Sequence, residues 1–328
     1  MNPEHHELAI VIINYKTPNL VIDCINSVIP EIKNLNAKII IVDNFSNDNS
    51  CDEIQKWVDK NKVQKQIKLI SSPNNGGFSD GNNIGIKDIK ADFYLLLNSD
   101  TVVRQGAIET LLNVAKSDNT LGLITPRLEW PDGTPQESCF KFHTPISELI
   151  SSARTGPITK IFNTYNVPQP VSNQQGHYEW LSFACVLVRS EVFEDIGLMD
   201  EGYFMYYEDV AFCFHAKKAG WKILNEPNAH VVHLRGGSSS VKSQAKQRKR
   251  LPRYFYESRT RYFHQAHGHL GLLLANILWT LGWGISSARG LFSASYQSDV
   301  TEHQWLDIWT NFINPLKAYI HPENYDKT

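Results

Sequence analysis

Short apolar runs recur along the first 126 residues and alternate with longer segments of mixed polarity. The runs predict β-strands at residues 8–13, 38–43, 67–71, 93–97 and 121–125. The segments between them predict helices at 18–30, 51–60, 79–90 and 105–116. Strand–helix–strand alternation favours a parallel sheet with right-handed crossovers and helices on its faces. The expected fold class is therefore α/β, with a Rossmann-like, mostly parallel central sheet.

The pattern becomes irregular after residue 126. Prolines and glycines interrupt residues 127–176, which predicts a long excursion with a helix near 146–154. Regular structure is expected to resume in a strand at 178–189, a helix at 190–196, a helix from about 208 to before 220, and short strands at 221–224 and 230–233.

The C-terminal part is different in character. Residues 270–285 are strongly apolar, but the run is short of the about 20 residues that a membrane span needs, so it predicts a packing or interfacial helix. A basic block at residues 242–261 precedes it, with Glu257 as its one acid. This pairing predicts peripheral contact with a membrane; the alternative is solvated charge beside a helix buried in the core or in a homo-oligomer interface. We expect a catalytic domain at residues 1–240 and a helical extension at 241–328.

Net charge, cysteine spacing and the first residues limit which partners and which cellular compartment we expect. The net charge of −2 provides no overall field that favours nucleic acid. The five cysteines form no C-x-x-C pair, which fits a reducing compartment. The first residues lack the pattern of a signal peptide. We therefore expect a cytoplasmic protein, with peripheral contact at the inner face of the cell membrane.

Three predicted strands end in polar residues. Asn14 and Tyr15 follow the first strand, Asp43 ends the second, and Asn98 and Asp100 follow the fourth. The carboxyl ends of parallel strands meet at one edge, and open α/β sheets bind ligands there. The sequence therefore predicts chemistry at this edge.

Two of these acids have specific interpretations. Asp100 is a hard oxygen ligand suited to Mg²⁺ or Mn²⁺, although it could instead cap the helix that begins near Gln105. A carboxylate at Asp43 could accept the imide N–H of uracil or thymine. The alternative is an Asx turn, because turn-forming residues follow it.

A loop rich in glycine and asparagine opens the helix predicted at 79–90. Backbone N–H groups at Asn75, Gly76 and Gly77, with Asn82 in the same segment, could hold anionic oxygens. The alternative is a plain turn and helix cap. The loop matches neither G-x-G-x-x-G nor a Walker A motif, which disfavours an ordinary NAD or ATP fold.

Two further sites lie later in the chain. Glu208 and Asp209 follow an aromatic run at a predicted helix start, where a carboxylate could act as general base. Acids also favour that end of a helix for purely electrostatic reasons. His233 ends a short strand; a structural role is commoner, but beside a hard cation it would be a borderline ligand that favours Mn²⁺.

Six blocks of residues, in order, resemble family 2 inverting glycosyltransferases of the GT-A fold. They are Val-Ile-Ile-Asn-Tyr (11–15), Ile-Val-Asp-Asn (41–44), Asn-Asn-Gly-Gly-Phe (74–78), Leu-Leu-Asn-Ser-Asp (96–100), Tyr-Glu-Asp-Val (207–210) and Val-His-Leu-Arg-Gly-Gly-Ser (232–238). The last two, with Trp180 before Ala184 to Arg189, are most similar to rhamnosyltransferase-like bacterial members.

The resemblance implies binding roles. Asp43 would recognise the pyrimidine base, and Asn98 and Asp100 would occupy the family's D-x-D position. Asp100 and His233 would hold Mn²⁺ or Mg²⁺. Because Asn98 replaces the first aspartate of that motif, the ion would have fewer anionic ligands.

The resemblance also implies a mechanism. Asp209 would take the proton from an acceptor hydroxyl, Glu208 would support it, and Trp180 would line the sugar or acceptor subsite. One displacement would invert the anomeric carbon. The expected donor is a dTDP-linked 6-deoxyhexose such as rhamnose, with a UDP-hexose as the alternative. The expected acceptor is a cell-surface glycan, free or lipid-linked.

Three other classes fit the sequence less well. A sugar-nucleotide pyrophosphorylase would carry a glycine-rich loop after its first strand, whereas residues 14–18 contain no glycine. A non-catalytic nucleotide- or carbohydrate-binding module would not need a carboxylate at Asp209. A processive membrane synthase would have several long apolar spans and a Q-x-x-R-W block, and the sequence contains neither.

Overall fold

The computed structural model describes residues 5–235, 241–292, 296 and 298–327. The chain divides into two compact units. The first comprises Met1–Cys139, Pro170–Glu201 and Phe212–Ser238; the second comprises Phe140–Gln169, Gly202–Ala211 and Ser239–Thr328. Residues 236–238 of the sixth sequence block lie outside the described residues. A separate domain at 241–328 stays a prediction.

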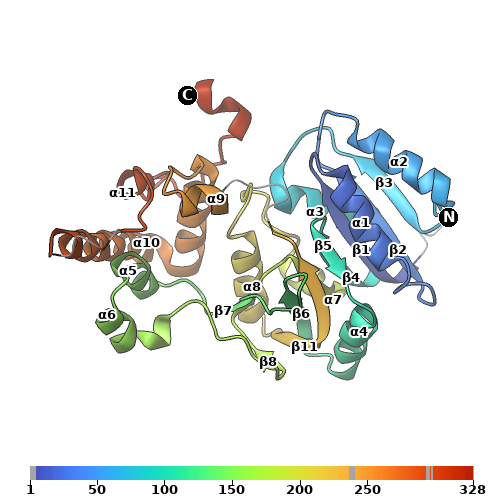
Figure 1. Cartoon of the computed structure of the whole chain (residues 1–328), viewed down its shortest axis with the longest axis horizontal. Helices are drawn as coiled ribbons and strands as arrows, with labels where there is room; N and C mark the ends of the chain where they lie inside the picture. The colour runs from blue at the N-terminus through green and yellow to red at the C-terminus, as the bar shows by residue number, and fades with distance from the viewer. Residues whose placement is uncertain (1–4, 236–240, 293–295, 297, 328) are drawn as a thin grey trace. The chain divides into compact units, whose positions relative to one another are not determined.

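A mixed, mostly parallel sheet forms the centre of the first unit (Figure 1). Its strands are β1 (His5–Asn14), β2 (Ala37–Asp43), β3 (Ile67–Ser71), β4 (Lys90–Asn98), β5 (Thr101–Val103), β6 (Leu121–Glu129), β8 (Gly176–His177), β10 (Cys185–Arg189) and β11 (Lys222–His233). The order is β3-β2-β1-β4-β10-β6-β11-β5, and β8 pairs with β11. Strands β1 to β4 are parallel to one another, as are β6 and β11. This confirms the predicted fold class.

The strands form where the sequence has unbroken apolar runs because both faces of the sheet are covered. Ile10 and Ile12 of β1 and Leu95 and Leu97 of β4 belong to one buried cluster. Helices α1 (Pro18–Val28), α2 (Ser50–Asn61), α3 (Gly77–Asp88), α4 (Ala107–Ser117) and α7 (Ser190–Ile196) accompany the sheet. The predicted positions of the first five long strands and of these helices are confirmed within a few residues.

Helix α3 lies close to β1 because two of its residues are glycines. A Cβ atom at Gly85 would lie 2.5 Å from Val11 Cγ1, and one at Gly81 would lie 3.1 Å from Ile13 Cδ1. Neither distance leaves normal room for a side chain, so glycine sets the separation between helix and strand. This packing fixes the loop before α3 next to the ends of β1 and β2.

Three predicted strands were wrong in detail. Strand β10 is antiparallel to both β4 and β6, and the run predicted at 178–189 divides into β9 (Trp180–Leu181) and β10. Strand β9 belongs to a small sheet with β7 (Cys139–Phe140). The two short strands expected at 221–224 and 230–233 are one strand, β11, whose pairing with β6 shifts register between Glu226 and His230. Local periodicity does not report such an irregularity, because the partner strand determines it.

The second unit is helical. It contains α5 (Pro145–Ala153), α6 (Gly156–Ile161), η1 (Asn163–Tyr165), α9 (Val241–Lys246), α10 (Arg253–Phe292), α11 (Gln304–Asp307) and η2 (Pro322–Lys327), while α8 (Glu208–Lys218) begins in it and continues into the first unit. Helices α5 and α10 pack side by side (Figure 1).

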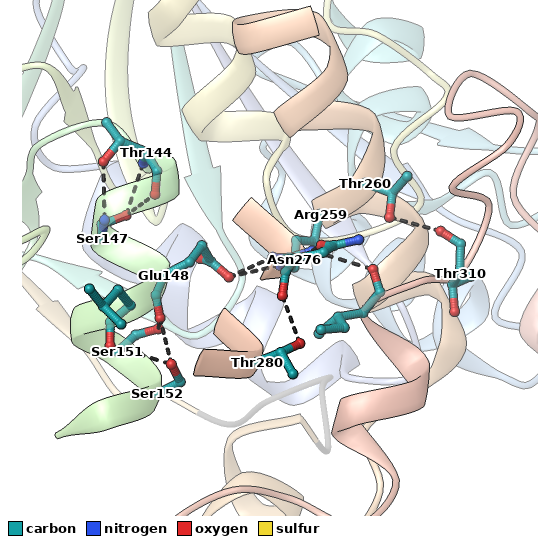
Figure 2. A network of polar contacts seen from close by, with 12 residues as sticks. Thr144, Ser147, Glu148, Ser151, Ser152, Arg259, Thr260, Asn276, Thr280 and Thr310 are labelled. Carbon is teal, nitrogen blue, oxygen red and sulfur yellow. Dashed lines mark hydrogen bonds and ion pairs between the residues drawn. The ribbon is translucent and has the colours of Figure 1, made fainter. Parts of the chain in front are cut away.

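A buried polar network joins α5 to α10 (Figure 2). Arg259 of α10 donates from Nε and Nη2 to Glu148 Oε2 of α5, over 3.0 and 2.6 Å, and from Nη1 to Asn276 Oδ1 over 2.8 Å. Arg259, Glu148 and Asn276 are all buried. Burying charges is costly unless each is paired, so this network specifies how the two helices meet.

The length assigned to the C-terminal apolar helix was wrong. Helix α10 runs through Phe292 and changes direction at Gly268, whose backbone is non-helical with φ 68°. At ~1.5 Å per residue, residues 269–292 would extend about 36 Å, which is longer than the ~30 Å hydrocarbon core of a bilayer. Of the part of the chain that the structure describes, Arg253–Gly290 is a helix long and apolar enough to cross a membrane. The length of this helix therefore does not decide whether it is a membrane span or a packing or interfacial helix.

Candidate functional site

Asn14 and Asp43 meet at the carboxyl ends of β1 and β2, as the sequence predicts. They are paired in the β1–β2 register, and Asn14 Nδ2 donates to Asp43 Oδ1 over 2.6 Å. Ser46 donates to the same carboxylate from Oγ over 2.6 Å and from its backbone N over 3.1 Å. The Asp43 carboxylate thus organises the turn after β2. A buried carboxylate with fixed donors on one side can still present its other lone pairs to a ligand.

The glycine–asparagine loop is connected to the same edge. Asn44 Nδ2 donates to Asn75 Oδ1 over 3.1 Å and to the carbonyl of Gly77 over 2.8 Å. Gly77 has φ 83°, a conformation that glycine adopts without strain. A Cβ at Gly76 would overlap the side chain of Asp80, so this position also needs glycine. The loop is therefore held by Asn44, a residue to which the sequence reasoning gave no role.

Two predicted binding residues have local contacts. Asn82 is buried and donates from Nδ2 to the carbonyl of Phe78 in its own helix over 3.0 Å. Tyr15 is half-buried, and the Lys16 ammonium lies 5.2 Å from the centre of its ring. Each of these side chains therefore has a contact within the protein itself, and the predicted roles of Asn82 and Tyr15 in ligand binding stay predictions.

Asp100 and His233 lie together. His233 Nε2 is 3.5 Å from Asp100 Oδ1, and both side chains are nearly buried. The antiparallel pairing of β5 with β11 places His233 opposite Thr101, next to Asp100. The backbone N of Leu234 also donates to the carbonyl of Asp100 over 2.9 Å. Strand pairing therefore joins two residues that are distant in sequence.

This pair fits a divalent cation. Ligand atoms that share one ion at ~2.1 Å lie roughly 3 to 4 Å apart, which includes the observed 3.5 Å. A carboxylate oxygen and an imidazole nitrogen together suit Mn²⁺ better than Mg²⁺. His233 Nδ1 is buried without a hydrogen-bond partner among the described residues. Within those residues, no group of three or more His, Cys, Asp or Glu side chains could hold a metal ion, so other ligands would have to come from a bound molecule or water.

Asn98 has the position that the D-x-D resemblance implies, at the end of β4. Its carbonyl accepts from Thr101 Oγ1 over 2.7 Å, which closes the turn containing Asp100. Ser99 Oγ lies 3.4 Å from Thr17 Oγ1 at the start of α1. The tip of β4 is thus tied both to its own turn and to the first helix.

Arg235 and Gln136 were missed by sequence reasoning. Gln136 donates from Nε2 to the carbonyl of His233 over 2.7 Å and accepts a hydrogen bond from Arg235 Nε. The Arg235 guanidinium lies 5.3 Å from the centre of the Trp130 ring. Burial lowers the pKa of Arg235, while the negative charges of Glu137 and Asp100 act in the opposite direction. Arg235 belongs to the sixth sequence block, and this was the feature of the sequence that could have identified it as a candidate site residue.

Glu208 and Asp209 are the first residues of α8, which confirms the predicted helix start. They belong to the second unit, whereas Asp43 and Asp100 belong to the first. Burial, and then the charge of Asp209, raise the pKa of Glu208 well above its ordinary value. Glu208 Oε2 is buried without a hydrogen-bond partner among the described residues. Asp209 Oδ1 accepts from the backbone N of Val210 over 2.8 Å. Two adjacent carboxyls with unlike environments can hold different protonation states, as acid–base pairs do.

The backbone before these acids is unusual. Tyr206 and Tyr207 both have positive φ, 71° and 67°, in the left-handed region. Tyr207 packs against His143, Phe255 and Tyr262, with ring centres 5.2 to 5.8 Å apart. Strained non-glycine residues persist only where packing holds them, and they are commonest at functional sites.

Trp180 is buried in β9 of the first unit. Its role at a sugar or acceptor subsite stays a prediction.

A separate cavity of about 670 Å³ lies in the second unit, lined in part by Arg250, Arg253 and Tyr254. Arg250 is paired with Asp307 and Arg253 with Glu257, so the charges of the cavity wall are largely compensated.

Comparison with known proteins identifies a family for the chain. The model of Glycosyl transferase family 2 matches residues 9–196, more than half of the chain. The hexosyltransferase Agl10 of low-salt glycan biosynthesis from Haloferax volcanii is 29% identical over 65% of this chain and 62% of its own length. The N-acetylglucosaminyl-diphospho-decaprenol L-rhamnosyltransferase of Mycobacterium tuberculosis is 28% identical over 58% and 60%. The chain thus spans about three fifths of the length of these relatives.

Solved structures show the same fold. GalNAc-T7 in complex with UDP, GalNAc and Mn²⁺ superposes with a TM-score of 0.58 and 14% identity, over 95% of this chain and 58% of that one. The mannosyltransferase PcManGT from Pyrobaculum calidifontis, in complex with GDP-Man and Mn²⁺, gives 0.54 and 11%, over 89% and 78%. Both are glycosyltransferases, and at these identities the likeness concerns fold alone. The family match over more than half of the chain shows that the chain belongs to glycosyl transferase family 2.

Proposed function

We propose that this protein transfers a sugar from a nucleoside-diphosphate donor to a hydroxyl of a cell-surface glycan, with inversion at the anomeric carbon. The preferred donor is dTDP-rhamnose. Relatives named as rhamnosyltransferases support this choice, among them the mycobacterial enzyme and WbbL of Escherichia coli, which is 26% identical over 48% of this chain.

The observation that carries the proposal is the Asp100–His233 pair, which lies where β4 and β11 end. Bound there, Mn²⁺ or Mg²⁺ would neutralise charge on the departing diphosphate. Asp100 and His233 would hold the ion, with Asn98 beside them in place of the first acid of the motif. The solved neighbours that contain Mn²⁺ support a divalent ion.

The chain's other residues would bind and orient the donor. Asp43, positioned by Asn14 and Ser46, would accept the imide N–H of the pyrimidine. Backbone N–H groups of the loop at residues 75–77 would contact anionic oxygens at the start of α3. Arg235, oriented by Gln136 and Trp130, would add a fixed positive charge for the diphosphate.

Asp209 would be the general base. It would accept the proton of the acceptor hydroxyl as that oxygen attacks the anomeric carbon and the bond to the diphosphate breaks. Glu208, with its raised pKa, would retain a proton, so that one of two adjacent carboxyls is neutral and Asp209 carries the charge.

A UDP-hexose is the second candidate donor. The relative from Haloferax volcanii is named a hexosyltransferase, and GalNAc-T7 is described with UDP. An imide-accepting carboxylate at Asp43 would suit uracil and thymine equally. The proposed acceptor is a glycan on a lipid carrier, which would place the protein at the cytoplasmic face of the membrane.

A donor screen tests the proposal. The protein is incubated with Mn²⁺ or Mg²⁺, an acceptor glycan, and dTDP-rhamnose, UDP-hexoses or GDP-mannose in turn, and nucleoside diphosphate release is measured. We expect release from dTDP-rhamnose. Release from a UDP-hexose alone would establish the second donor, and no release from any donor with lipid-linked or free acceptors would contradict the proposal.

A further inference from the structure

Trp130 is exposed and directly follows the carboxyl end of β6. Strands β4 and β6 are both antiparallel to β10, and β6 runs parallel to β11, so β4, β6 and β11 end at the same edge of the sheet (Figure 1). Trp130 is 37% exposed, whereas Trp57 and Trp221 of the same unit are half-buried and Trp180 is buried. The most open indole of the first unit therefore lies at the edge where the proposed ion would bind.

A tight turn fixes the position of Trp130. The backbone N of Gly133 donates to the carbonyl of Trp130 over 2.9 Å, and the backbone N of Trp130 donates to the carbonyl of Thr134 over 2.8 Å. Pro131 at the second position of the turn and Gly133 with φ 84° are residues that such a turn favours. Arg127 of β6 also donates from Nη2 to the carbonyl of Gly133 over 2.8 Å. The indole is thus presented on a fixed support, which lowers the entropy lost when a ligand binds.

Hydrogen bonds join this turn to the strand end that carries His233. Gln136 donates from Nε2 to the carbonyl of Glu129, directly before the turn, over 3.1 Å, and to the carbonyl of His233 over 2.7 Å. Arg235 donates from Nε to Gln136 Oε1 and from Nη2 to the carbonyl of Glu137 over 3.2 Å. The turn, the guanidinium and the proposed ion ligand are therefore held in one network.

Arg235 interacts with both Trp130 and Asp100. Its guanidinium lies 5.3 Å from the centre of the Trp130 ring. Burial lowers the pKa of Arg235 and the negative charges of Glu137 and Asp100 oppose this effect, so the guanidinium is within electrostatic reach of Asp100. Because Trp130 stays 37% exposed, Arg235 covers its ring only in part. A group bonded to a phosphate that Arg235 contacts therefore comes within reach of the indole.

The chemistry of the donor identifies that group. In a nucleotide sugar, the sugar is bonded directly to the second phosphate, and this is the bond that breaks during transfer. Asp43, the proposed base-binding residue, ends β2, and β2 and β6 lie on opposite sides of β4 in the strand order. A donor with its base at β2 and its diphosphate at the Asp100–His233 pair therefore directs its sugar toward the end of β6.

We propose that Trp130 packs its indole against the sugar ring of the nucleotide-sugar donor. This inference rests on the proposed function and adds a residue that recognises the sugar itself. The C–H groups on one face of a pyranose are apolar, and a flat aromatic ring buries them effectively. A 6-deoxyhexose carries a methyl group where a hexose carries a hydroxymethyl group, so the contact suits rhamnose. Trp130 thus contributes to the affinity for the sugar, whereas Arg235 contributes to the affinity for the diphosphate.

Calorimetric titration without an acceptor separates these two contributions. Wild type, Trp130→Ala and Arg235→Ala are each titrated with dTDP and with dTDP-rhamnose in the presence of Mn²⁺. We expect Trp130→Ala to weaken dTDP-rhamnose binding by about 10-fold and to change dTDP binding by less than about 3-fold. Arg235→Ala should weaken the binding of both ligands by the same factor. Trp130→Phe retains a flat ring and should recover most of the lost affinity for dTDP-rhamnose.

Trp221→Ala is the matched control. Trp221 precedes β11 and so lies at the opposite edge of the sheet, where its Nε1 donates to Asp195 Oδ2 over 2.9 Å. This variant should bind both ligands as wild type does, and far-ultraviolet circular dichroism should show the native fold in every variant. If the donor screen selects a UDP-hexose, UDP and that UDP-hexose replace the two dTDP ligands.

Two results would overturn the inference. Equal weakening of dTDP and dTDP-rhamnose binding in Trp130→Ala would show that the indole acts only through Arg235. Unchanged affinity for both ligands would show that the indole does not touch the donor, and a loss of transfer in that case would assign Trp130 to the acceptor. Wild-type protein that binds neither the dTDP nor the UDP ligands would instead contradict the proposed function, and this inference with it.

Discussion

His233 Nε2 lies 3.5 Å from Asp100 Oδ1, and the pairing of β5 with β11 creates this proximity. If the pair holds a divalent ion, removing either side chain removes one of few protein ligands. We expect Asp100→Ala and His233→Ala each to lower kcat/KM by at least about 100-fold, because metal ions contribute several kcal/mol of charge stabilisation. Calorimetric titration of nucleoside diphosphate with Mn²⁺ should show the same loss.

His230 provides the control for this experiment. It lies on the same strand, and its Nδ1 is 2.9 Å from Glu129 Oε2. His230→Ala should leave metal-dependent nucleotide binding unchanged. Unchanged binding in Asp100→Ala and His233→Ala as well would remove both residues from the metal site.

The two adjacent carboxyls of α8 should differ in their effect on turnover. Asp209→Asn should lower kcat by about 10²- to 10⁴-fold, the range expected for a general base, with little change in donor KM. Glu208→Gln preserves a neutral side chain and should cost no more than about 10-fold. A larger loss in Glu208→Gln than in Asp209→Asn would reverse the assignment.

Glu208 should also make stability depend on pH. Its folded pKa is raised above the ordinary 4.5, so the native state retains a proton that the unfolded chain releases. The free energy of unfolding therefore falls as pH rises from about 4.5 toward the raised value. Glu208→Gln cannot ionise, and its denaturant midpoint should exceed that of wild type at neutral pH but not at pH 4. Parallel pH profiles for the two proteins would show that the carboxyl is solvated.

Arg235 should affect donor binding. Arg235→Ala removes a charge that burial, Gln136 and Trp130 hold in place, and we expect donor KM to rise about 10-fold, in line with ~1.5 kcal/mol for a charge-assisted contact. Gln136→Ala should produce part of this effect, because it orients the guanidinium. Arg104→Ala, which removes an arginine paired with Glu129, should leave KM unchanged. Steady-state kinetics at varied donor concentration would measure all three.

The buried Arg259–Glu148 pair should dominate the stability of the second unit. Glu148→Ala leaves a buried arginine without its carboxylate, and we expect a loss of about 3 to 5 kcal/mol in the free energy of unfolding. Arg259→Met/Glu148→Leu removes both charges and should cost much less. Chemical denaturation of both variants checks this; equal losses would show that packing, and not charge pairing, sets the cost.

Much of the first unit could be predicted from sequence because its information is local. Apolar runs such as the one in β4 identify buried strands, and the polar residues that end β1 and β2, Asn14 and Asp43, lie together at the carboxyl edge of the sheet. The order of the six blocks then indicated the family. The antiparallel direction of β10 and the irregularity in β11 depend on partner strands, which no local pattern encodes.

By itself the sequence determined the fold class, the family and the candidate acids, because periodicity, strand-end residues and motif order are properties of short segments. Only the tertiary structure decided which distant residues meet. In the folded protein His233 lies beside Asp100, Arg235 donates a hydrogen bond to Gln136, and Arg259 is paired with Glu148. One side of α10 is exposed. Strand pairing and helix packing create these contacts between segments far apart in the chain, so their energies cannot be assigned to any segment alone.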